Sequence, residues 1–175
     1  MLKRILNFIA RPIASPAIES LYRACVAQAR QPVFYTEIGI PDSVDGRFDL
    51  LIFHVLLVIL RLQDHTGETQ QLFDILFADM DKNLREMGVS DISIAKKMKP
   101  MLAAFYGRAK AYEDSLAADD ATLSSVLQRN MFGTATANSA ALQRLTAYAR
   151  HTQAALAAQP TDALLSGHIA FPKEI

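Results

Sequence analysis

The sequence predicts an all-α protein, a single-domain bundle of about six to seven helices around one buried apolar helix. Glycine and proline each occur only seven times in 175 residues, which favours helix over strand and irregular structure. Valine and isoleucine are scattered rather than gathered in alternating runs, so the chain has no credible strand. A chain of this length buries roughly 70% of the surface that it exposes when unfolded, which is enough for one real core.

Charge and cysteine content exclude several classes of protein. Lysine plus arginine and aspartate plus glutamate both number 18, so the formal net charge is zero and DNA is not an expected partner. Cys25 is the only cysteine, which excludes an internal disulfide and a cysteine-based zinc site and favours a reducing compartment. On the helix expected there, Cys25 is a small apolar residue.

Residues 1–15 form a separate basic amphipathic segment. Asn7 and Arg11 interrupt the apolar run that a secretory signal needs. On a helix, one face is apolar and the other carries polar and basic groups, as in helices that lie on anionic membranes. The alternative is that the apolar face packs on the protein's own domain. The candidates for membrane-surface contact are Lys3, Arg4, Phe8 and Arg11.

The first helix of the bundle is expected over residues 16–31, with Ser15 as its N-cap and Pro16 at its first position. Residues 31–46 are less regular, yet their apolar side chains predict packing along the bundle. Asp42 or Ser43 then caps the next helix.

The central helix is expected where residues 50–60 are apolar on nearly all sides, apart from His54. The run is bounded by Asp49 and Arg61 and is shorter than the roughly 18 residues that a membrane span needs. It is therefore predicted to be the buried core of the bundle. His54 is interpreted as a buried histidine that is hydrogen-bonded to a partner.

Two further helices are expected around Gly88. Residues 66–69 are predicted to form a turn, and a helix follows to Met87, where Gly88 supplies the left-handed C-cap. The second helix continues through Pro100 to Leu116. Small residues recur on it at 103, 107 and 111, and the glycine at position 107 predicts that another backbone approaches closely there.

The remaining elements are a helix over residues 119–131, a loop over 133–139, a long helix over 140–159 and a tail over 160–175. The helical domain is therefore expected to span residues 16–159.

The charges are unevenly distributed along the chain. Residues 64–91 hold seven acidic side chains against two basic ones, whereas residues 92–112 hold five basic side chains and no acid. Such a division is typical either of two helices that pair with each other or of a surface that recognises a charged partner. The sequence alone leaves both interpretations open.

No catalytic or cofactor motif accompanies this pattern: there is no phosphate loop, nucleophile elbow or dinucleotide fingerprint. Asp79 and Asp81 lie two positions apart and so point to different sides of a helix. Asp74 and Asp81 share a face but lie about 10 Å apart along the axis. No catalytic, cofactor or metal site is therefore expected.

Three long motifs resemble a known family. They are IPDSVDGRFDLL (residues 40–51), FADMDKNLREMGVSD (residues 77–91) and KKMKPMLAAFYGRAKAY (residues 96–112). Together they lie in a region from about 35 to 116 that resembles the ubiquinol–cytochrome c chaperone family, the Cbp3-like assembly factors of the cytochrome bc1 complex, in its alphaproteobacterial type.

The resemblance implies an all-helical, non-enzymatic chaperone that binds newly made cytochrome b, or another hydrophobic membrane-protein client. It also implies a small co-chaperone and a ribosome contact as candidate interactions, while the basic segment over residues 1–15 makes a peripheral membrane contact a further candidate. The expected location is the cytoplasm, at the face of the inner membrane, or the mitochondrial matrix side in a eukaryote. The partner-binding residues are expected to be Asp79, Asp81, Arg85, Glu86, Lys96, Lys97, Lys99, Tyr106 and Arg108.

Two other functions stay open at this point. One is an all-helical metal-dependent enzyme acting on a lipidic substrate through His54, Asp74 and Asp81. The other is an adaptor that contacts the ribosome or RNA through the lysines at positions 96, 97 and 99.

Overall fold

The computed structural model describes residues 14–133, 135 and 137–175, and in these residues every regular element is a helix. The all-α prediction is confirmed. Six helices are long and two are single turns, α2 and α8, which agrees with the expected six to seven. Their bounds are α1 Pro16–Ala29, α2 Val33–Thr36, α3 Val44–Arg61, α4 Thr66–Glu86, α5 Asp91–Leu116, α6 Asp120–Met131, α7 Ser139–Ala158 and α8 Thr161–Leu165.

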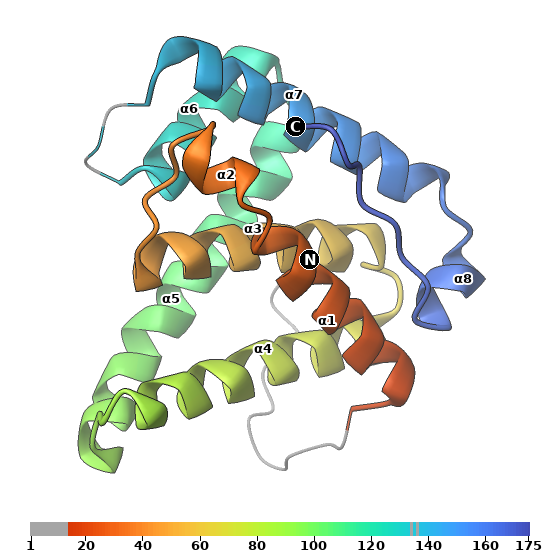
Figure 1. Ribbon diagram of the computed structural model, residues 1–175. Helices are drawn as coiled ribbons and strands as arrows, with labels where there is room; N and C mark the ends of the chain where they lie inside the picture. The colour runs from red at the N-terminus through yellow and green to blue at the C-terminus, as the bar shows by residue number, and fades with distance from the viewer. Residues whose placement is uncertain (1–13, 134, 136) are drawn as a thin grey trace.

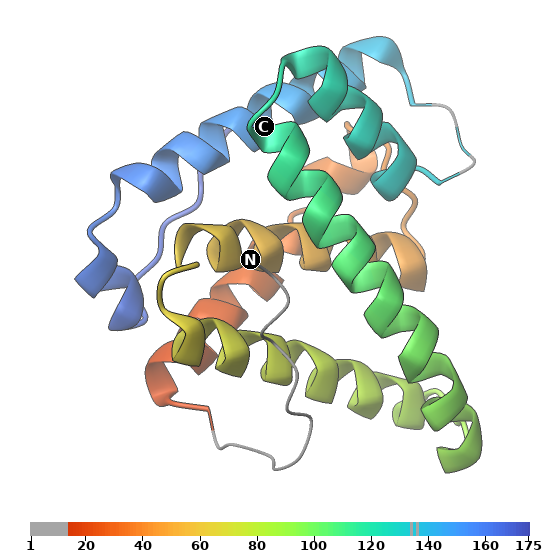
Figure 2. The same cartoon turned by 180° about the vertical axis from the view of Figure 1, so that it is seen from behind.

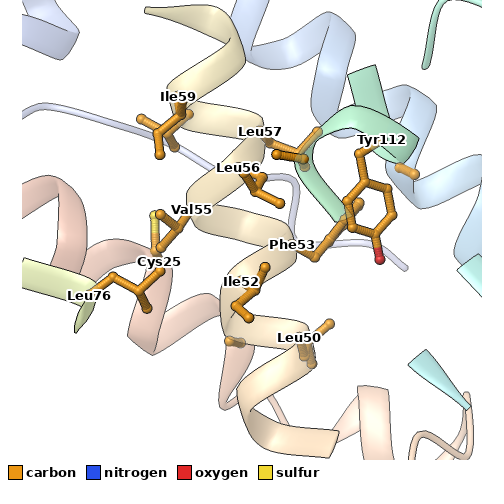
Figure 3. Packing of buried hydrophobic residues seen from close by; sticks show 14 of the residues in the cluster. Cys25, Leu50, Ile52, Phe53, Val55, Leu56, Leu57, Ile59, Leu76 and Tyr112 are labelled. Atoms are coloured by element: carbon orange, nitrogen blue, oxygen red, sulfur yellow. The ribbon is translucent and has the colours of Figure 1, made fainter. Parts of the chain in front are cut away.

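Helix α3 is the centre of the fold (Figure 1). It contacts α1, α4, α5, α6 and α7, and its residues 52–59 are all buried. In Figure 3, Val55 faces Cys25 of α1, while Phe53 faces Tyr112 of α5 with ring centroids 5.2 Å apart. Each such side chain contributes about 1.5–3 kcal/mol when fully buried. The prediction of a buried central helix is confirmed.

Side-chain caps begin four of the helices, and in α7 the Asn138 amide oxygen accepts from the Ala140 N–H at 2.9 Å. Ser15, Ser43 and Asp119 each accept a hydrogen bond from the backbone N–H three residues further on, at 3.3, 3.1 and 2.8 Å. Each cap satisfies one of the N–H groups that a helix start leaves without a partner. The predicted cap at Ser15 is confirmed, and Ser43 rather than Asp42 caps α3.

Residues 66–69 were predicted to form a turn, and this prediction is wrong. They are the first turn of α4, in which the Thr69 hydroxyl donates to the carbonyl of His65 at 3.1 Å. Glu68 in the same turn interacts favourably with the positive end of the helix. Sequence reasoning also missed the single turn of α2, although it placed Phe34 correctly in the core.

The two glycines singled out by the sequence have different roles. Gly88 has a φ of +80° directly after α4, as predicted, and its N–H donates to the Arg85 carbonyl at 2.9 Å. The close approach predicted at Gly107 is wrong. A Cβ placed on Gly107 meets nothing within 4 Å, and Ala103 one turn earlier is also exposed. Ala103 and Gly107 therefore face solvent, whereas Ala111 is partly buried against the core.

His54 lies fully buried in α3, as predicted. Its Nδ1–H donates to the Leu50 carbonyl at 2.8 Å, and its Nε2 accepts from the Tyr148 hydroxyl of α7 at 2.8 Å. Burial lowers the pKa of His54 to about 4, so the ring is neutral at physiological pH. The Tyr148 hydroxyl in turn accepts from Gln28 of α1 at 3.0 Å, so one polar chain joins three helices.

Cys25 is free and fully buried on α1, and its burial raises the pKa of the thiol above its usual range. It packs as an apolar residue within the main core, as expected from its place on the helix.

The tail after α7 packs back on the bundle. Leu164 of α8 is fully buried, and the Phe171 ring lies 5.4 Å from the His54 ring. Arg61 at the end of α3 donates to the carbonyls of Leu156 and Gln159, both at 2.9 Å. The amphipathic segment predicted over residues 1–15, with Lys3, Arg4, Phe8 and Arg11, lies outside the described residues up to position 13.

Candidate functional site

An open groove of about 400 Å³ lies where the end of α1, the start of α3 and the end of α4 meet. Figure 1 shows the course of helices α1, α3 and α4. Its volume is in the range of clefts that bind ligands or peptide side chains. Its lining residues are Val26, Ala29, Arg30, Tyr35, Val44, Asp45, Arg47, Phe48, Leu51, Asp79, Met80, Asn83, Leu84, Glu86, Met87 and Met101.

The groove is mostly apolar and rich in methionine. Met80, Met87 and Met101 come from two different helices, and methionine adapts to ligands of varied shape because its side chain is unbranched and flexible. Val44 is 63% exposed and Met87 is 51% exposed. These are two of the three most exposed large apolar side chains among the described residues. An apolar surface of this kind, within a concave site, is typical of a binding surface.

Charged side chains of both signs line the same groove. The basic side chains are Arg30 and Arg47, and the acidic ones are Asp45, Asp79 and Glu86. Arg47 is held by Asp42 at 2.5 Å, an exposed pair that contributes little stability. The arrangement is an apolar cleft with a polar margin, the anatomy that protein–protein interfaces have.

Asp79 also joins two walls of the groove. The Tyr22 hydroxyl of α1 donates to Asp79 Oδ2 of α4 at 2.7 Å. Burial and the neighbouring carboxylate raise the pKa of Tyr22 well above its usual range, so its hydroxyl stays protonated as the donor.

The partner-binding residues expected from the sequence fall into separate groups. Asp79 and Glu86 line the groove. Arg85 joins the two helices at their turn, because it bonds Asp81 of α4 at 2.7 Å and also pairs with Asp91 of α5. These pairs fix the geometry of the α4–α5 turn.

The expected residues of α5 are also divided. Lys96, Lys97 and Lys99 are exposed on its first half and do not line the groove. Tyr106 is partly buried and stacks on Phe73 with centroids 6.1 Å apart.

Arg108 is largely buried and pairs with Asp49 of α3 at 2.7 Å, where the two side chains are only 24% and 17% exposed. Burial raises the pKa of Asp49 to about 6, against the opposing effect of the Arg108 charge. The Arg108 Nε has no hydrogen-bond partner among the described residues. The geometry therefore gives Arg108 a structural role between α3 and α5.

Sequence reasoning missed most of the groove. Val44, Phe48 and Leu51 lie four and three positions apart and so share one stripe of α3. The apolar run recognised over residues 50–60 is largely buried by its neighbours and contains only Leu51 of this stripe, so it did not point to the groove.

The residues of the proposed metal-dependent enzyme are engaged elsewhere. Both ring nitrogens of His54 are hydrogen-bonded, Asp74 accepts from Gln70 at 2.8 Å, and Asp81 pairs with Arg85. Within residues 14–133, 135 and 137–175, no three His, Cys, Asp or Glu side chains are grouped to hold a metal ion. The structure does not favour this alternative.

No helix in the part of the chain that the structure describes combines the length and the hydropathy needed to cross a bilayer.

Comparisons with known proteins point to one family. The sequence pattern of the family described as "Ubiquinol-cytochrome C chaperone" matches residues 36–171, well beyond the region of the three motifs. A solved structure, the Cbp3 homolog from Brucella abortus, is similar with a TM-score of 0.81 and 31% identity, covering 90% of this chain and 89% of that one.

Curated relatives agree with this match. Ubiquinol-cytochrome-c reductase complex assembly factor 1 of Xenopus laevis is 22% identical over 86% of this chain and 78% of its own length. The mouse protein of that name is 25% identical, over 85% of this chain and 52% of its own length. Protein CBP3 of Saccharomyces cerevisiae is 28% identical over 57% of this chain and 32% of its own length. The chain therefore spans about half or less of the mouse and yeast proteins.

Proposed function

The chain belongs to the ubiquinol–cytochrome c chaperone family, and we propose on this premise that it is an assembly factor of the cytochrome bc1 complex that holds a hydrophobic client in the groove. The client class is newly made cytochrome b or another apolar membrane-protein segment. The relatives' names describe assembly of ubiquinol–cytochrome c reductase, and this supports the proposal that the chain helps to assemble that complex. The exposed apolar groove supports the mode of binding.

The observation that carries the proposal is the exposure of Val44 and Met87 in one methionine-rich cleft. Exposure of such apolar side chains to water is unfavourable. A client side chain that covers them removes this apolar surface from water and so stabilises the complex. The cleft is small enough to take a few side chains of an apolar helix at a time. Binding is therefore reversible, which a chaperone requires so that the client can be passed on.

The charged margin orients the client rather than holding it. Exposed charges around an apolar centre contribute mainly to specificity and to the rate of association. Asp79 and Glu86 serve this role within the groove. Of the other residues of the expected partner surface, Lys96, Lys97 and Lys99 are exposed outside the groove, where they are available to a co-chaperone or ribosome. The rest are engaged within the fold: Asp81, Arg85, Tyr106 and Arg108.

The protein acts without catalysis or a cofactor, because holding and releasing a client needs neither. It works in the cytoplasm at the inner-membrane face, or on the matrix side in a eukaryote, where its client is inserted. The basic amphipathic segment at residues 1–15 supports this placement by its composition.

Photo-crosslinking tests the groove directly. A photoreactive residue at position 44 is expected to crosslink to nascent cytochrome b, whereas one at the exposed Ala154 of α7 is not. Equal crosslinking from both positions, or crosslinking from position 154 alone, would contradict the groove assignment.

Complementation tests the function. Deleting the gene is expected to lower the content of the bc1 complex, and Ala154→Asp is expected to restore it. Val44→Asp is expected to restore it poorly, because a carboxylate in the cleft must lose its water when a client binds. Both variants should show the melting temperature of the wild-type chain, since both positions are exposed.

A further inference from the structure

The turn between α4 and α5 forms a projecting end of the molecule. In both Figures 1 and 2 it lies at the far side from α7 and α8. Two of the three exposed large apolar side chains among the described residues lie here, Met87 at 51% and Ile92 at 73% exposure. A single exposed apolar residue is common on protein surfaces. Two of them, one on each side of a projecting turn, indicate a binding surface. We call residues 87–99 the α4–α5 tip.

Basic side chains adjoin these apolar ones. Lys96, Lys97 and Lys99 are exposed on the first half of α5. Because each residue turns a helix by about 100°, Ile92, Lys96 and Lys99 lie on one stripe of α5. Apolar and cationic groups thus share one exposed face.

The acidic groups around the tip are largely balanced by neighbours. Asp81 and Asp91 both pair with Arg85, and Glu86 lies 3.8 Å from Lys82. The sequence from Ile92 to Tyr112 contains no acid. Residues 81–99 hold five basic and three acidic side chains, so the tip and its surroundings keep a net positive charge of two, carried by the exposed lysines.

We propose that the α4–α5 tip binds an anionic lipid surface. Ile92 and Met87 enter the headgroup boundary, and the lysines contact lipid phosphates. Apolar side chains beside lysines are the combination by which peripheral proteins bind the membrane interface. Each lysine close to an anionic surface strengthens binding about fivefold.

The tip's composition favours lipid over RNA as the source of the phosphates. Single-stranded RNA is bound by aromatic side chains on which bases stack, and residues 82–99 contain no aromatic residue. An exposed isoleucine has no matching group on an RNA backbone, whereas lipid chains offer one.

Lipid binding at the tip bears on the proposed function because Met87 belongs to both surfaces. When the tip is bound to the membrane, the groove lies next to the lipid. An apolar segment can then pass between the groove and the membrane. The lipid contact itself does not depend on the groove having a client.

Vesicle flotation of the full chain tests the proposal, with phosphatidylcholine vesicles that contain or lack phosphatidylglycerol. Binding is expected only with the anionic lipid and is expected to fall as salt rises. Lys99→Glu should weaken the association at least about fivefold. Lys173→Glu, an equal charge change at an exposed position of the tail, should have a much smaller effect.

The apolar part of the tip is tested separately. Ile92→Ser is expected to weaken vesicle binding several-fold, while Val44→Ser at the groove leaves it unchanged but lowers client crosslinking from a photoreactive residue at position 47, which also lines the groove. This pair separates failure of the lipid proposal from failure of the groove proposal. Vesicle binding that is unaffected by both Lys99→Glu and Ile92→Ser would overturn the tip assignment and favour residues 1–13. Binding of an RNA oligonucleotide that Lys99→Glu weakens and Ile92→Ser does not, without vesicle binding, would overturn it in favour of RNA.

Discussion

Tyr22 of α1 and Asp79 of α4 are joined by a 2.7 Å hydrogen bond from the phenol hydroxyl to Oδ2. These helices form two walls of the groove, and Asp79 is one of its lining residues. The bond therefore sets how α1 and α4 lie at the place where the client is proposed to bind.

Tyr22→Phe is expected to destabilise the fold by about 1.5 kcal/mol, because it removes a hydrogen bond to a charged group and leaves Asp79 without this donor. Urea unfolding at neutral pH measures the loss. Client crosslinking from position 44 should fall as well, since the groove walls are no longer tied. The control is Tyr35→Phe. It also removes a tyrosine hydroxyl at the groove, but that hydroxyl donates to the Ala29 carbonyl and not to a side chain of α4. Equal stability of the wild-type chain and Tyr22→Phe would contradict the role given to this bond.

The two glycines of the α4–α5 region should respond to alanine with opposite signs. Gly88→Ala is expected to destabilise by about 1 kcal/mol, because its φ of +80° is unfavourable for a residue with a Cβ. Gly107→Ala is expected to stabilise by about 0.5–1 kcal/mol, because the site is open and alanine is the better helix former. Thermal melts resolve the difference as shifts of a few degrees in opposite directions. Destabilisation by Gly107→Ala would contradict this and would indicate that another backbone does approach Gly107 closely.

Stability should depend on pH through His54. Its folded-state pKa of about 4 lies below the unfolded value of 6.5, so the unfolded chain binds the extra proton between these values. The contribution of neutral His54 to the free energy of unfolding is fully present above pH 6.5 and is lost as the pH falls toward 4. Because one pKa unit corresponds to about 1.4 kcal/mol, the full loss is about 3 kcal/mol.

Comparison with His54→Gln isolates this effect. Asp49 acts in the opposite direction in part of the same range, because its pKa is raised to about 6 in the folded chain. Both proteins contain Asp49, so the difference between their unfolding free energies reports the histidine. The difference should narrow as the pH falls from 6.5 to 4. A constant difference over that range would show that His54 is not neutral in the fold.

The Asp49–Arg108 pair should behave as a coupled structural unit. Arg108→Met is expected to destabilise by about 2 kcal/mol at neutral pH, because it leaves a largely buried carboxylate without its cation. The loss should shrink near pH 5, where Asp49 takes up a proton. Adding Asp49→Leu should recover most of the stability. Additive losses in this double-mutant cycle would argue that Arg108 acts mainly at the surface, as the sequence predicted.

The sequence was informative where one local force decides the structure. Ser15, Gly88 and the apolar run in α3 each act through their own backbone or through burial, and all three predictions are confirmed. The burial of His54 followed from its apolar neighbours.

Relationships between distant segments were not readable in the same way. Gly107 lies in a helix interior whether or not another backbone is close, so its type alone did not reveal that it faces solvent. Arg108 was taken for a surface residue because its partner, Asp49, lies 59 positions away on another helix. The groove combines residues of α1, α2, α3, α4 and α5, and no pattern within a single helix predicts that these residues meet.

The burial of Cys25 has a practical consequence for labelling. It is the only cysteine of the chain and is fully buried, and its raised pKa keeps the sulfur as an unreactive thiol in the folded protein. A second cysteine placed at the exposed position 45 of the groove or 90 of the α4–α5 tip is therefore the one that a maleimide dye reaches. Fluorescence from both surfaces can then be recorded while Val44 and Ile92 are kept, so client capture and lipid docking can be timed against each other.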